Sequence, residues 1–292
     1  MNSPIASGVL SAFALLSGAA LSQTYVDLDF SNNVQPALDL NPNGSTLGPW
    51  YHSGSFLDFA NAGSYNGTSI DVRVSVAGLI DGEGPGLRDT STYQWVGWLP
   101  SYNDASTNDD LGVYYRHDGN SLQQTGGIAW TLSFYESGSN FSNPITLPGV
   151  RFLVYDHDGE RYQSESIRTF AGDGFAGYQL HDGSGIHVHD EDGSYRFDAR
   201  GEGHPETTAD GGMILYYHNT ASIRFDLFAT TRPQLPGPNS GIFAAWDGNL
   251  SLTGGNSNGF GEFVAVPEPS APLMVGVATV TMLLRRTRSS AA

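Results

Sequence analysis

The stretch Ile70-Asp71-Val72-Arg73-Val74-Ser75-Val76 alternates strictly between apolar and polar side chains. Successive side chains of an extended chain point to opposite faces, so this pattern predicts a β-strand with one buried face. The same two-residue period recurs along the chain, and no long stretch between residues 24 and 264 shows a helical period. The segments that carry it are 24–30, 70–76, 93–99, 112–116, 128–135, 150–155, 175–180, 185–189, 195–199, 213–217, 221–229, 242–246 and 260–264.

Asp-Gly dipeptides punctuate these segments. Both residues tolerate a positive φ angle, so an Asp-Gly pair between alternating runs indicates a tight hairpin turn. They begin at Asp81, Asp118, Asp158, Asp173, Asp182, Asp192, Asp210 and Asp247. The sequence therefore predicts an all-β domain over residues 23–264, an antiparallel β-sandwich or jelly roll. A β-propeller would need an internal repeat, which the sequence lacks.

The charge is strongly negative. The formal net charge is −17, with 13 Lys+Arg against 30 Asp+Glu, and every basic residue is an arginine. Three of those basic residues and one acidic residue lie in 265–292, which leaves the remainder at 10 against 29, or −19. Such a surface repels nucleic acid and attracts divalent cations. The absence of cysteine excludes disulfides and thiolate chemistry.

The richest acidic stretch follows segment 150–155. Asp156, Asp158, Glu160 and Glu165 place four carboxylates within ten residues. Hard oxygen ligands on a loop suit Ca²⁺, so a structural Ca²⁺ site is one interpretation, although the spacing is not that of an EF-hand. The alternative is an ordinary Asp-Gly turn with solvated acids.

His187 and His189 form a second pair of candidate ligands. Residues at i and i+2 of a strand share a face, so the two imidazoles could bind one transition metal. The alternative is a solvated edge strand that binds no metal.

Tryptophans supply the third set of candidates. Trp95 and Trp98 could stack against sugar rings as a carbohydrate-binding surface, since aromatic faces pack well against C–H groups. Trp50, Trp130 and Trp246 are further candidates. Core packing is the competing role for all of them.

No catalytic motif is recognisable. The chain has no Gly-x-Ser-x-Gly, no His-Glu-x-x-His and no phosphate-binding Gly-Lys-Ser/Thr. Paired carboxylates of a glycosidase could still be hidden among so many acids, because sequence does not give their separation.

The first 22 residues read as a secretory signal peptide. Residues 5–20 are rich in Ala, Leu, Ser and Gly, and Ala20-Leu21-Ser22 is a small-x-small site before Gln23. We therefore expect export through the Sec pathway.

The segment 265–292 consists of a proline-containing motif, an apolar run and an arginine-rich end, in that order. Val266, Pro267, Glu268, Pro269 and Ser270 come first, an uncharged apolar run follows over 271–284, and Arg285, Arg286 and Arg288 close it. Prolines cannot continue a helix, so a helix would begin after Ser270. At about 1.5 Å per residue, the apolar run spans roughly 21 Å, short of the ~30 Å hydrocarbon core. A transient membrane segment fits better than a permanent anchor.

This segment closely resembles the PEP-CTERM sorting signal, which combines a Pro-Glu-Pro motif, a short hydrophobic helix and an Arg-rich end. The resemblance is limited to residues 266–292. It implies a Gram-negative bacterium and an exosortase-type processing enzyme that cleaves near Pro267-Glu268-Pro269. It also implies transient insertion of 271–284 into the inner membrane, followed by delivery to the cell surface or the extracellular polysaccharide matrix.

Together these features predict an exported, non-catalytic β-sandwich protein, with Ca²⁺ as its only candidate cofactor. A carbohydrate-binding, lectin-like module that binds polysaccharide is the first alternative. A polysaccharide hydrolase or lyase is the second.

Overall fold

A computed structural model describes residues 24–32, 34, 56–81, 95–102, 109–116, 125–157, 159, 163–199, 208–231, 241–253 and 257–267. Of residues 79, 81, 95–102, 114–116, 163, 231 and 241–243 it describes the backbone alone. The predicted signal peptide and the sorting segment from Glu268 onward lie outside these ranges. No helix within them is long and apolar enough to cross a membrane.

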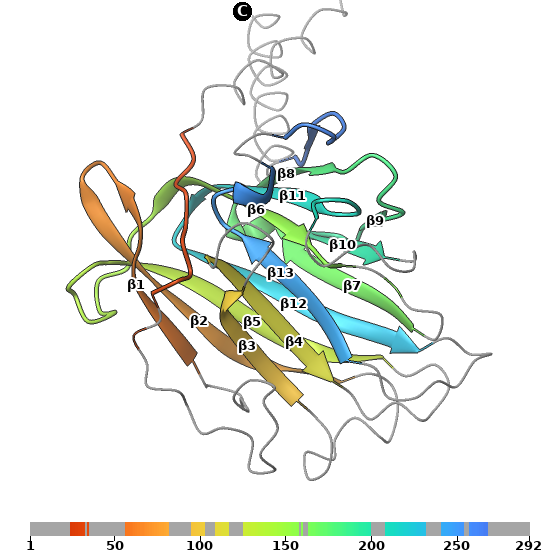
Figure 1. Ribbon diagram of the computed structural model, residues 1–292, viewed down its shortest axis with the longest axis horizontal. Coiled ribbons are helices and arrows are strands. Elements are labelled where there is room, and N and C mark those ends of the chain that lie inside the picture. The colour runs from red at the N-terminus through yellow and green to blue at the C-terminus, as the bar shows by residue number, and fades with distance from the viewer. Residues whose placement is uncertain are drawn as a thin grey trace, which may run out of the picture.

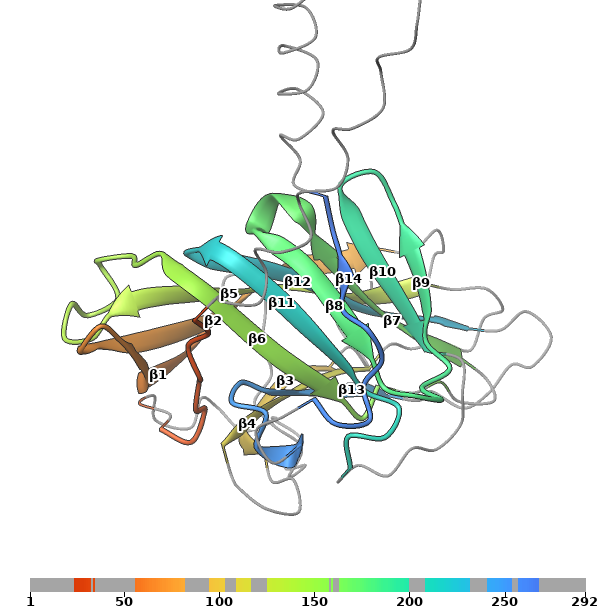
Figure 2. The ribbon, with the colours of Figure 1, turned by 90° about the horizontal axis from the view of Figure 1, so that it is seen from above.

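The described residues form two seven-stranded antiparallel sheets, which confirms the predicted all-β sandwich (Figures 1 and 2). Sheet one has the order β1-β2-β5-β12-β7-β10-β9, and sheet two has the order β14-β8-β11-β6-β13-β4-β3. The strands are β1 (Phe56–Tyr65), β2 (Thr68–Asp81), β3 (Trp95–Tyr102), β4 (Asp110–Arg116), β5 (Thr125–Glu136), β6 (Leu147–Tyr155), β7 (Gln163–Phe170), β8 (Phe175–Leu180), β9 (His187–Asp190), β10 (Ser194–Ala199), β11 (Met213–Thr220), β12 (Ser222–Thr231), β13 (Gly241–Asp247) and β14 (Val264–Ala265). Among the described residues, two short 3-10 helices, η2 (Ala171–Asp173) and η3 (Ser251–Thr253), interrupt the connections.

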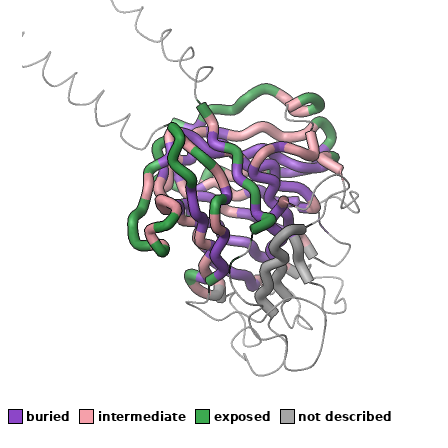
Figure 3. The backbone as a smooth tube through the Cα atoms, turned by 60° about the vertical axis from the view of Figure 1, so that its left-hand side comes forward, coloured by how far each residue is buried: buried purple, intermediate pink, exposed green. Residues whose placement is uncertain are grey.

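The alternating stretch that begins at Ile70 lies in β2, between β1 and β5. Val72, Val74 and Val76 are buried, whereas Arg73 and Ser75 are partly exposed on the opposite face. The period of two therefore separates the inner face of sheet one from its outer face, as predicted. Figure 3 shows buried backbone running through the sandwich and exposed backbone at its turns.

Aromatic rings fill the space between the sheets. Trp130 of β5 stacks on Phe225 of β12, with ring centroids 4.7 Å apart. Trp246 of β13 meets Trp130 edge to face at 4.8 Å, which joins sheet two to sheet one. Both tryptophans are fully buried, so for them core packing is the observed role.

Two hairpins use the expected turn chemistry. Asn66 and Gly67 between β1 and β2 have φ angles of 51° and 79°, and Asp192 and Gly193 between β9 and β10 have 40° and 92°. Two consecutive positive φ values are what a type I′ turn requires.

Of the Asp-Gly pairs that the structure describes in full, only Asp192-Gly193 forms the predicted hairpin turn between neighbouring strands; the pairs that begin at Asp173, Asp182, Asp210 and Asp247 lie in other connections, so a hairpin is the wrong prediction for them.

The strand predicted over 24–30 is wrong. Only Val26 forms an isolated bridge, and the alternate N–H groups of the segment donate to three different places. Val26 N–H donates to Gly149 O, Leu28 N–H to Gly248 O and Phe30 N–H to Asp109 O. The segment crosses an edge of the sandwich and buries alternate side chains without joining a ladder, so the period of two misleads here. The strand predicted over 260–264 is likewise reduced to β14.

Candidate functional site

The acidic loop after β6 is only partly described. Asp156 lies in the turn with a φ of 52°, and Glu165 is buried in β7. Asp158 and Glu160 lie outside the described residues. Within the described ranges, no group of three or more His, Asp or Glu side chains could hold a metal ion. The Ca²⁺ site thus remains a prediction that depends on Asp158 and Glu160.

His157, which sequence reasoning missed, fixes this loop to sheet one. Its side chain is buried, and its Nε2 lies 3.1 Å from the carbonyl oxygen of Phe197 in β10. Burial lowers the pKa of His157 from 6.5 to about 4, opposed by the hydrogen bond to Phe197 and the negative charge of Asp198. A histidine buried as the neutral form costs stability in acid, because the unfolded chain binds the proton first.

We expect this to make the protein acid-sensitive. Between pH 7.5 and 4.5, His157 should remove about 2.5 kcal/mol of stability, because protonation of the unfolded chain begins near pH 6.5 and that of the folded chain only near pH 4. The loss should level off below pH 4. The measurement is the free energy of unfolding in urea across this range, compared with His157→Gln, whose amide nitrogen can replace Nε2. Equal pH dependence in both proteins would contradict the assignment.

The candidate ligands His187 and His189 lie on the edge strand β9. His189 Nε2 is 3.0 Å from Asp198 Oδ2, and Arg196 Nε is 3.0 Å from the other carboxylate oxygen of Asp198. Arg196 also pairs with Glu191 at 2.9 Å. In the described structure Arg196 forms ion pairs with Asp198 and Glu191 on this face, which contains no group of three or more metal-binding side chains.

Trp95 and Trp98 lie on β3, at an edge of sheet two. Their backbone positions pair with Arg116 and Val113 of β4. Their side chains are not described, so a sugar-binding role for them stays a prediction. Trp50 lies outside the described residues.

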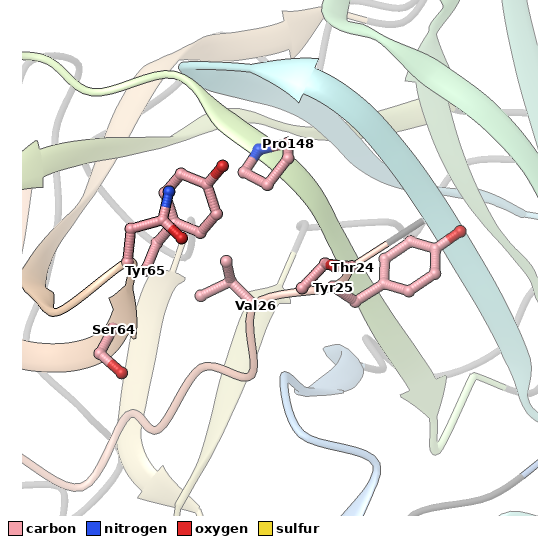
Figure 4. A pocket seen from close by; sticks show the side chains of 7 residues that line it. Thr24, Tyr25, Val26, Ser64, Tyr65 and Pro148 are labelled. Carbon is pink, nitrogen blue, oxygen red and sulfur yellow. The ribbon is translucent and has the colours of Figure 1, made fainter. Parts of the chain in front are cut away.

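Clefts on the described surface include the following two. One, of about 430 Å³, lies between residues 24–26, the β1–β2 turn and the start of β6 (Figure 4). Tyr65 and Pro148 stand on one side of Val26, and the Tyr25 ring points away on the other. The lining of this first cleft contains no carboxylate or imidazole.

The second cleft, of about 610 Å³, lies between η2 and the β11–β12 turn. Its titratable side chains are Asp173 and His218. Burial raises the pKa of Asp173, whose carboxylate accepts the backbone N–H of Arg224 at 2.9 Å. His218 shares a hydrogen bond of 3.0 Å with the Tyr25 hydroxyl. Both groups therefore bind neighbouring parts of the fold.

The outer face of sheet one carries stacked arginines that the sequence did not reveal. The guanidinium of Arg73 lies 4.1 Å from the ring centroid of Phe56 and 4.7 Å from that of Phe141. Arg224 lies 4.7 Å from the ring of Phe170. Contacts of this kind are attractive and fix the plane of the guanidinium.

The described fold and surface define an all-β sandwich with open clefts and a polar outer sheet face. No protein-family model matches the sequence, and no curated protein matches it significantly. Among solved structures, the chain is similar to the N-terminal domain of the Streptococcus gordonii adhesin Sgo0707, with 9% sequence identity and a TM-score of 0.49. The match covers 77% of this chain and 64% of that chain, which is less than two thirds of its length. Similarity at this level assigns neither a family nor a function.

Proposed function

We propose that the chain is an exported, non-catalytic β-sandwich protein that acts at the cell surface or in the extracellular polysaccharide matrix. An exosortase-type enzyme would deliver it there after transient membrane insertion of residues 271–284. The observation that carries this proposal is the order of the segment 266–292, where a Pro-Glu-Pro motif, a short apolar run and three arginines follow one another.

The folded body continues to the first residue of this motif. β14 pairs with β8, and the N–H of Val266 donates to the carbonyl oxygen of Ala176 at 2.9 Å. The side chain of Val266 is buried in the main core. Only residues 267–270 separate this point from the apolar run, and four residues span at most about 14 Å. Under the proposal, the sandwich would lie directly against the membrane until it is cleaved.

Processing is tested by the mass of the C-terminal peptide of the surface-located protein in a host that has an exosortase. We expect this form to end near Pro267-Glu268-Pro269 and to lack residues 271–292. Replacing both Pro267 and Pro269 by alanine should leave the tail attached and hold the protein in the inner membrane.

The matched control replaces Pro236 and Pro238, which also form a Pro-x-Pro sequence, by alanine. It should be processed like the unmodified chain. A surface-located protein that retains Arg288 would refute the proposed sorting route.

A further inference from the structure

Arginine–phenylalanine stacks lie on the outer face of sheet one, and two of them flank a strip of small hydroxyl side chains. The first stack holds Arg73 between Phe56 and Phe141, and the second places Arg224 on Phe170. Phe56 is 36% exposed, and Phe141 and Phe170 are half-buried. Aromatic rings that are partly exposed offer an apolar face against which C–H groups of a ligand pack well.

Carboxylates hold both guanidinium groups in place. Arg73 binds Asp58 in bidentate fashion, through Nε at 2.7 Å and Nη2 at 2.8 Å. Arg224 Nε and Nη2 each lie 3.0 Å from one oxygen of Asp226, and the Arg224 backbone is bound to Asp173. The planes of the stacks are therefore set before any ligand arrives, which lowers the entropic cost of binding.

The strip between the stacks follows from the strand order. Arg73 of β2 is paired with Ser133 of β5, and Ser133 with Ser222 of β12. In the next row, Ser75 is paired with Thr131. The Ser133 and Ser222 hydroxyls are 3.2 Å apart. Neighbouring strands are about 4.8 Å apart, so β2 and β12 lie roughly 10 Å from each other across this strip.

The loop that follows β5 holds Phe141 over Arg73 at a conformational cost. Asn140 and Phe141 have φ angles of 54° and 57°, a region that a bulky side chain rarely adopts. The loop is closed by the Glu136 N–H, which donates to Asn143 O at 3.0 Å. The Phe141 ring also contacts Tyr135 edge to face, with centroids 5.6 Å apart. Backbone strain that places an aromatic ring at the surface is typical of binding sites.

The local charge indicates which ligand fits. Although the chain carries a net charge of −17, the guanidinium groups of the two stacks are paired with carboxylates: Arg73 with Asp58, and Arg224 with Asp226, which also pairs with Arg168. An anionic polymer would be repelled by the acidic protein, and the arginines that could attract it are already paired with carboxylates. A cation would be bound weakly, because these carboxylates already bind arginines. What remains is an uncharged ligand with both apolar faces and hydroxyl groups.

We propose that this face binds a neutral polysaccharide. The C–H faces of its sugar rings would pack on Phe56 and Phe141, and its hydroxyls would exchange hydrogen bonds with Thr131, Ser133 and Ser222. This proposal rests on the proposed function only for the location, the cell surface or the matrix, and it adds the class of partner that the protein binds there. Binding by the purified chain is independent of sorting, so either proposal can fail alone.

The test is binding of the full chain, purified in detergent, to immobilised neutral hexasaccharides of glucose, mannose and galactose, with a hyaluronan hexasaccharide as the anionic probe. We expect at least one neutral hexasaccharide to bind. Phe56→Ala should weaken that binding at least fivefold. Phe141→Asn should do the same without loss of folding, because asparagine tolerates a positive φ.

Phe263→Ala is the matched control, because Phe263 is also 36% exposed but packs against sheet two beside Tyr216. It should leave glycan binding unchanged. The proposal is overturned if no neutral hexasaccharide binds, if only the anionic probe binds, or if Phe263→Ala weakens binding as much as Phe56→Ala does. Unaltered thermal midpoints of the variants keep loss of binding separate from loss of fold.

Discussion

Replacing Trp130 by alanine is expected to lower the free energy of unfolding by about 4 kcal/mol. Trp130 is fully buried in β5, and its ring touches Phe225 of the same sheet and Trp246 of the opposite sheet. Removing it leaves a cavity where the two sheets meet. A close-packed interior relaxes only partly around a deleted ring, so the lost contacts and the cavity both contribute to the cost.

Urea denaturation at pH 7.5, followed by circular dichroism, measures this change. Phe56→Ala is the control, since Phe56 is 36% exposed and stacks on Arg73 at the surface, so its loss should change stability by no more than about 1 kcal/mol. A loss of less than 1 kcal/mol in Trp130→Ala would contradict the packing described above.

Gly127→Ala is expected to cost about 3 kcal/mol or more, or to prevent folding. Gly127 lies in β5 opposite Phe228 of β12. A Cβ atom on Gly127 would lie 2.1 Å from the carbonyl oxygen of Leu227 and 2.3 Å from the Cβ of Phe228. Neither neighbour can move aside, because the first is backbone and the second is fixed to it. The two strands would have to separate.

Gly78 provides a matched control in the adjacent strand β2. A Cβ atom there would meet nothing within 4 Å, so Gly78→Ala should be neutral or stabilise by about 0.5 kcal/mol through lower entropy of the unfolded chain. The same denaturation experiment compares the two variants. Equal stability of Gly127→Ala and Gly78→Ala would show that β5 and β12 are not in the register described.

The structure changes which aromatic residues are candidates for carbohydrate binding. Trp130 and Trp246 are in the core and cannot stack on a ligand. On the outer face of sheet one, the aromatic rings beside hydrogen-bonding side chains include Phe56 and Phe141, which are not tryptophans. A search that considers tryptophan alone misses this surface.

The end of the fold bears on the proposed processing. Val266 is both the first residue of the sorting motif and a buried residue of the core. A processing enzyme that acts near Pro267 would therefore work beside a folded domain. Phe263, which packs directly on Gly177 of β8, lies in the same part of the chain.

The sequence alone was sufficient to predict the all-β class and the inner face of the strands. In residues 70–76, successive side chains point to opposite faces because the backbone is extended. This alternation is local, so it does not depend on which strands become neighbours. The same locality explains the error at 24–30, where alternate side chains are buried although the backbone bonds go to separate partners. Burial of alternate side chains does not require backbone hydrogen bonds to a neighbouring strand. The two-residue period of the sequence therefore predicts the burial but not the strand pairing.

The candidate binding face was decided by tertiary structure. Ser133 and Ser222 are 89 residues apart in sequence and meet only because β5 and β12 are neighbours. Arg73 acquires its aromatic partners from the strand β1 and from a loop beyond β5. Strand order and register depend on the packing of the whole core, so no local pattern encodes which surface side chains come together. Composition and period therefore determined the fold class, and long-range pairing determined the site.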